Sequence, residues 1–225
     1  MNLLKTSIAA AALAAFLPMA AQAALALKVE DLMPGGSSIT VTDGSMAPGA
    51  TDFNSTAGAI TWVGAIGSWS LNASTGFGTA TNAGPFGIDL NSINSSSTGG
   101  TLRLSFTETD INYGTLAPSA MIGEIGGVTG GTVKYWMYVD DANVQFGQGA
   151  MVFSGQAGPG AFADSGWSPT SLTNPFSMTL VVEIMHAGPN TTSFNFDSSV
   201  PEPGVLALTS LALLGAGWAS RRRKA

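Results

Sequence analysis

The 225-residue chain contains no cysteine, one histidine, and only eight lysines and arginines. Without cysteine it forms neither disulfide bridges nor Cys-ligated zinc or iron–sulfur centres, and it has no thiol nucleophile. A single imidazole is too few nitrogen ligands for a zinc site. Because the few cations stand beside 14 aspartates and glutamates, the sequence also argues against binding to nucleic acid.

The cations are unevenly placed along the chain. One lysine stands near the start, and four cations fill positions 221–224. The remaining three are Lys28, Arg103 and Lys134. Since 13 of the 14 acids lie within 24–199, that stretch carries a charge of −10, against −6 for the whole chain. The chain is therefore an acidic body between two basic, apolar ends.

Residues 1–23 have the form of a secretory signal peptide. A lysine precedes an apolar run over 8–17 that is too short to span a membrane. The small residues Ala21 and Ala23 stand at the −3 and −1 positions of a signal-peptidase site. We predict cleavage by signal peptidase after Ala23 and export of the body.

The C-terminal segment, 200–225, has three parts. The motif at 200–203 contains two prolines that hold Glu202 in an extended conformation, which a protease or transpeptidase requires of its substrate. The apolar stretch 204–220 would rise about 25 Å as a helix, marginally enough to cross a bilayer. The basic tail 221–225 follows, and the positive-inside rule places it in the cytoplasm.

Together these parts resemble the PEP-CTERM sorting signal of Gram-negative, exopolysaccharide-producing bacteria. The resemblance implies recognition by an exosortase, a membrane-embedded cysteine transpeptidase, after transient residence in the inner membrane. It also implies a mature protein at the cell surface or outside the cell. The positions it assigns are Pro201, Glu202 and Pro203 as the sorting motif, and Arg221, Arg222 and Arg223 as the cytoplasmic retention cluster. A weaker alternative is an unprocessed single-pass membrane protein.

The body, 24–199, is predicted to be all-β: a single antiparallel β-sandwich of jelly-roll or immunoglobulin-like type. Apolar residues recur at alternate positions, and no helical pattern separates these runs. We expect the run at 178–186 to be a central strand, because Val181 and Met185 make its second face partly apolar. At least eight strands are expected, around 25–29, 39–41, 60–62, 69–71, 102–106, 133–139, 178–184 and 194–196.

Three aromatic residues are candidates for stacking on a sugar. Trp136 and Tyr138 alternate with the apolar residues of their strand, so they form either a sugar-stacking platform or ordinary packing of a central strand. Trp167 lies in the turn-rich stretch 155–175, which is longer than an ordinary loop and is the best candidate for a recognition loop.

The sequence shows no catalytic motif. His186 shares the parity of the apolar residues in 178–184, which indicates a histidine at the edge of the core, and no G-x-S-x-G elbow accompanies it. Asp140 and Asp141 are weak candidates for calcium in an acidic turn, without an EF-hand frame.

These observations favour an exported, non-enzymatic protein without a cofactor, with a structural or adhesive role at the cell surface or in the extracellular matrix, where exopolysaccharide is a possible partner. The alternative is a carbohydrate-binding module or a polysaccharide-acting enzyme that uses the aromatic and acidic residues. Binding of a defined sugar would distinguish the two.

Overall fold

The structure is a computed structural model that describes residues 24–78, 87–112 and 119–200. Ala21 and Ala23 of the predicted cleavage site, the Pro-Glu-Pro motif at 201–203 and the arginines at 221–223 lie outside these residues. Within the described ranges, no helix has the length and hydropathy that a membrane span requires.

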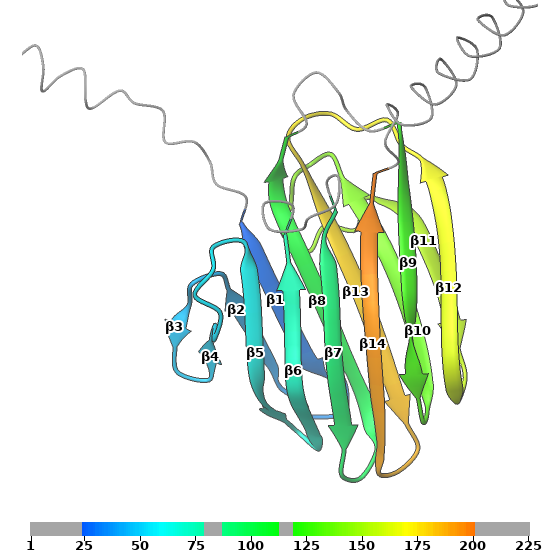
Figure 1. The fold of residues 1–225 in the computed structure, drawn as a ribbon. Coiled ribbons are helices and arrows are strands. Elements are labelled where there is room, and N and C mark those ends of the chain that lie inside the picture. The colour runs from blue at the N-terminus through cyan, green and yellow to red at the C-terminus, as the bar shows by residue number, and fades with distance from the viewer. Residues whose placement is uncertain (1–23, 79–86, 113–118, 201–225) are drawn as a thin grey trace, which may run out of the picture.

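The described residues form fourteen β-strands, and strands of the sandwich pair antiparallel (Figure 1). The strands are β1 (Leu25–Asp31), β2 (Ser38–Thr42), β3 (Met46–Ala47), β4 (Ala50–Thr51), β5 (Ala59–Ile66), β6 (Trp69–Phe77), β7 (Asp89–Ser96), β8 (Gly100–Ile111), β9 (Ala120–Thr129), β10 (Thr132–Asp140), β11 (Ala150–Ala157), β12 (Gly160–Pro169), β13 (Phe176–His186) and β14 (Asn190–Ser199).

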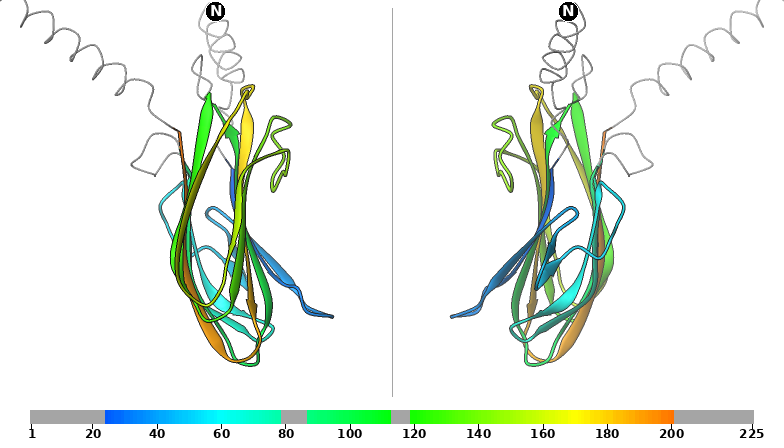
Figure 2. Two further views of the ribbon diagram at one scale, coloured as in Figure 1. Left: turned by 90° about the vertical axis from the view of Figure 1, so that its right-hand side faces the viewer. Right: turned by 90° about the vertical axis from the view of Figure 1, so that its left-hand side faces the viewer.

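Twelve of these strands make two six-stranded sheets that pack face to face (Figure 2). Sheet I has the order β11-β10-β13-β8-β1-β2, and sheet II has the order β12-β9-β14-β7-β6-β5. This confirms the predicted all-β, antiparallel sandwich, and β13 is central in sheet I as expected. The sandwich has more strands than immunoglobulin-like and jelly-roll sandwiches usually have.

Short turns gather at one end of the sandwich. The turns that join β7 to β8, β9 to β10, β11 to β12 and β13 to β14 each carry the chain from one sheet to the other at this end (Figure 1). The two described chain ends, Ala24 and Val200, lie at the opposite end, where the Ala24 carbonyl accepts from the Thr109 amide and the Ser198 amide donates to the Ile88 carbonyl.

The alternation of inward and outward side chains along the strands explains which residues form the core. In β10, Val133, Tyr135, Met137 and Val139 point inward and are buried, while the residues between them are half-buried on the outer face. The rings of Tyr135 and Phe153 pack against Phe196 of sheet II with centroid distances of 6.2 Å each, in edge-to-face geometry. This aromatic cluster joins the two sheets.

The eight expected strands are all present, but the prediction of a recognition loop over 155–175 is wrong. Most of that stretch belongs to strands, chiefly β12, which pairs with β9 along its whole length. The sequence does not indicate this strand because β12 is an edge strand made mainly of small and polar residues. Phe162 is the one hydrophobic side chain of β12 that packs against the core.

Candidate functional site

A groove lies on the outer face of sheet II, over β12, β9 and β14. Gly126 of β9 is at its centre, with Ala163 of β12 as its register partner on one side and Asn195 of β14 on the other. Because Gly126 has no side chain, the sheet is hollowed there, and this open groove has a volume of about 670 Å³. A second hollow of about 280 Å³ shares Gly126 and Asn195 and extends the groove over β7. We call the two together the outer groove.

Acidic side chains form a row across sheet II, and two of them, Glu124 and Asp197, line the outer groove. Glu124 of β9 is the register partner of Asp197 of β14, and Asp197 is the register partner of Asp89 of β7. Register partners in antiparallel strands have side chains on the same face and close together. The row therefore places three carboxyl groups across three adjacent strands.

Two asparagines accompany this row. The Asn91 side-chain amide donates to Asp89 Oδ1 over 3.1 Å, and Asn195, the register partner of Asn91, also hydrogen-bonds the Asp89 carboxylate. Burial raises the pKa of Asp89, and the hydrogen bonds from Asn91 and Asn195 oppose that rise. The floor of the outer groove thus presents both amide donors and oxygen acceptors.

Trp167 stands beside the outer groove. It shares the outer face of β12 with Ser165 and Ala163, and it is 69% exposed, the most exposed aromatic side chain among the described residues. Its register partner is Ile122, two positions along β9 from Glu124. At a rise of about 3.4 Å per residue, Trp167 lies about 14 Å along the strand from Ala163. A ligand that contacts both positions has to be an oligomer.

The other two predicted aromatic residues lie on the opposite side of the molecule. Trp136 and Tyr138 are half-buried on the outer face of sheet I, where their register partners in β13 are Val181 and Thr179. The structure therefore does not bring them together with Trp167. Their partial burial beside β13 agrees with packing of a central strand.

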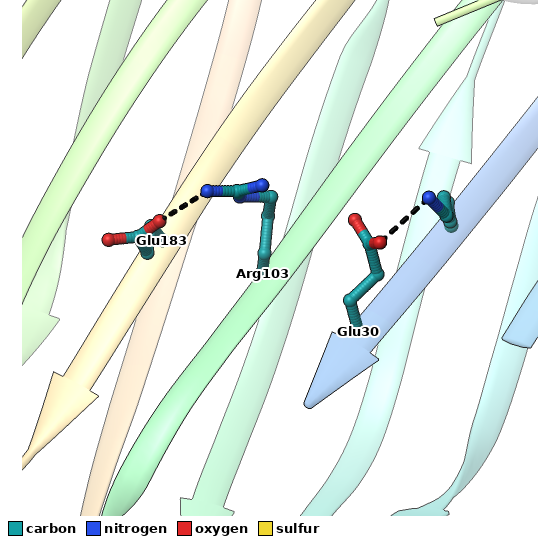
Figure 3. A network of polar contacts seen from close by, with 4 residues as sticks. Glu30, Arg103 and Glu183 are labelled. Atoms are coloured by element: carbon teal, nitrogen blue, oxygen red, sulfur yellow. Dashed lines mark hydrogen bonds and ion pairs between the residues drawn. The ribbon is translucent and has the colours of Figure 1, made fainter. Parts of the chain in front are cut away.

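The cations of the described residues also lie on the outer face of sheet I. Lys28 pairs with Glu30 over 2.7 Å, and Arg103 pairs with Glu183 over 2.8 Å. Figure 3 shows Arg103 between Glu183 and Glu30, its register partners on either side. Lys134 is in turn the register partner of Glu183. By contrast, the six strands of sheet II contain no lysine or arginine.

His186 is buried at the edge of the core. Its Nδ1 lies 2.8 Å from Ser96 Oγ, its Nε2 lies 2.8 Å from Thr192 Oγ1, and its ring stacks on Trp69 with a centroid distance of 4.8 Å. Burial lowers the pKa of the imidazole. Neither hydrogen-bond partner is a carboxylate, so this arrangement is not a Ser-His-Asp triad.

Asp140 and Asp141 stabilise loops. Asp140 Oδ1 accepts from the Ala142 amide over 3.0 Å, and Asp141 Oδ1 accepts from the Thr173 amide over 2.8 Å. The part of the chain that the structure describes has no group of three His, Asp or Glu side chains that could hold a metal ion. Calcium binding by the two aspartates stays a hypothesis.

A larger hollow, of about 810 Å³, lies at the end of the sandwich where the short turns between the sheets gather. Much of its wall is glycine, as at Gly99, Gly100, Gly130 and Gly131. The one aromatic side chain among its lining residues is His186, and both nitrogens of this ring already form hydrogen bonds within the core. The outer groove has the denser set of outward-facing polar groups and is the better candidate for a binding site.

Sequence reasoning found Trp167 and missed the rest of the outer groove. The available signal was a polar alternation: Asp89 and Asn91, and likewise Asn195 and Asp197, are two positions apart in strands whose intervening residues are buried. Gly126 gives no such signal, because an isolated glycine in a sequence is equally compatible with a strand and with a turn.

No protein-family model and no curated protein matches the chain. Among solved structures, a carbohydrate-binding module of the β-sandwich superfamily is 13% identical over 77% of this chain and 71% of that one, with a TM-score of 0.36. A xylan-binding domain of carbohydrate-binding-module family 22 is 13% identical over 61% and 89%, with a TM-score of 0.31. A PA14 sugar-binding domain from an RTX adhesin is 15% identical, with a TM-score of 0.28. The match covers 45% of this chain and 46%, less than half, of the adhesin domain. With TM-scores this low, these likenesses leave the function of the outer groove open.

Proposed function

We propose that this protein binds polysaccharide in the outer groove without acting on it chemically. The observation that carries the proposal is the hollow at Gly126, with amide and carboxylate groups on its floor and the exposed Trp167 beside it. Sugar hydroxyls donate and accept hydrogen bonds, and the floor offers partners for both. The indole face suits the apolar face of a sugar ring.

The size of the outer groove favours a polymer. The distance of about 14 Å between Ala163 and Trp167 spans more than one sugar unit, so a ligand that reaches both positions is a chain of sugars. An exported protein that binds polysaccharide in this way would have the adhesive role that its sequence favours.

Replacing Trp167 with alanine is expected to weaken glycan binding about tenfold or more, because the loss of an aromatic anchor residue typically costs about 2 kcal/mol or more of binding free energy. The test is a glycan array with the full chain, purified in a polyoxyethylene detergent that carries no sugar. Trp136→Ala on sheet I is the matched control and should bind as the unchanged protein does.

Three outcomes would contradict the proposal. They are no binding to any glycan, loss of binding in Trp136→Ala with Trp167→Ala unaffected, and release of reducing ends from a bound glycan. The last result would establish an enzyme instead of a binding protein.

We further propose that the chain reaches the cell surface through its C-terminal segment. The support is the order of Pro201-Glu202-Pro203, the apolar stretch 204–220 and the arginine cluster 221–223 at the C-terminal end of the sequence. Mass spectrometry of the protein recovered from the surface of exporting cells should show a chain from Ala24 to about residue 200. Recovery of the intact cluster in surface material would refute processing by an exosortase.

A further inference from the structure

The two outer faces of the sandwich differ in charge. The charged side chains on the outer face of sheet II are acids, chiefly Glu124, Asp197 and Asp89, and its strands contain no lysine or arginine. On sheet I every cation has an acid beside it, as in the Arg103–Glu183 pair of Figure 3. The outer groove therefore lies on a face that carries acidic side chains and no lysine or arginine.

We propose that the outer groove selects uncharged glycans and excludes acidic ones such as polyuronates. This inference rests on the proposed function and names its ligand class. A sugar carboxylate seated above Gly126 would lie near the acidic row formed by Glu124, Asp197 and Asp89, with no cation on that face to compensate. Neutral hydroxyls meet no such repulsion and hydrogen-bond the same oxygens.

The expected size of the exclusion follows from Coulomb's law. Two like charges about 5 Å apart in water repel by about 0.8 kcal/mol, a factor of about four, and the repulsion grows as water is displaced. Because the acidic row brings several carboxylates near a bound sugar, we expect a polyuronate to bind at least about tenfold more weakly than a neutral glycan of equal length.

Salt gives a second expectation. The Debye length falls from about 30 Å at 0.01 M to about 3 Å at 1 M ionic strength, so salt screens the acidic row from a charged ligand. Affinity for the polyuronate should rise with salt, while affinity for the neutral glycan should change little.

The test measures binding of neutral glucan oligomers and of polygalacturonate oligomers of the same length to the full chain. Glu124→Gln should raise affinity for polygalacturonate about fourfold at low salt. Glu30→Gln is the matched control, because it removes the same charge from the outer face of sheet I and should leave the preference unchanged.

The outcomes separate this inference from the proposed function. Equal or tighter binding of polygalacturonate by the unchanged protein at low salt would overturn charge selection and leave polysaccharide binding intact. If Glu30→Gln and Glu124→Gln raise affinity for polygalacturonate equally, the preference comes from the net charge of the protein, and the role of the acidic row is overturned. Failure to bind either glycan would refute the proposed function itself.

Discussion

Replacing Gly126 with valine is expected to abolish glycan binding and to leave the domain folded. A Cβ at Gly126 would meet only the Phe162 carbonyl oxygen, at an ordinary contact distance of 3.6 Å. Valine also suits a strand better than glycine, which costs about 0.5–1 kcal/mol in a strand interior. The new side chain would stand in the outer groove between Ala163 and Asn195 and displace the ligand.

The neighbouring glycine provides the contrast. A Cβ at Gly127 would collide with the backbone carbonyl of Ser193, which cannot move without breaking the pairing of β9 with β14. Gly127→Val should therefore lose the cooperative thermal transition that Gly126→Val keeps, as followed by circular dichroism. If Gly126→Val is folded and binds glycan with unchanged affinity, the binding site lies elsewhere.

Replacing Phe196 with alanine is expected to lower the free energy of unfolding by about 3–5 kcal/mol, a large part of the stability of a typical domain. Phe196 is fully buried and contacts Tyr135 and Phe153 across the interface between the sheets. Its removal would leave a cavity that the two packed sheets cannot close. Urea denaturation of the variant and the unchanged protein measures the difference.

Phe53→Ala is the matched control, because the Phe53 side chain is 64% exposed. We expect it to change the free energy of unfolding by less than about 0.5 kcal/mol. A loss of under 1 kcal/mol in Phe196→Ala would show that the aromatic cluster does not hold the sheets together.

The predictable part of the fold was the part with apolar alternation. The strands around 102–106, 133–139 and 178–184 were clear because every inward position is a large apolar residue. Strand β7 was not, since its inward positions include Ser92, Asn94 and Ser96, which are buried although they are polar. Ser92 donates a hydrogen bond to Asn94 Oδ1, and Ser96 hydrogen-bonds the His186 ring.

The candidate site was less predictable than the fold. Trp167 was identified as a ligand-binding aromatic residue, but it was assigned to a loop and grouped with Trp136 and Tyr138. Which face a residue occupies follows from alternation within one strand. Which residues share a groove depends on the order and register of strands far apart in sequence, as with Gly126 and Asn195, and these are set by packing of the whole sandwich.

The position of the two chain ends has a consequence for how the domain would stand on a cell. Ala24 and Val200 leave the sandwich at the end opposite the short turns between the sheets, and the strands run between these two ends (Figure 1). A tether joined to Val200 would hold the strands upright, with the short turns between the sheets outermost. The outer groove would then open sideways, parallel to the cell surface. Neighbouring molecules on one cell could therefore bind a single polysaccharide chain that lies between them.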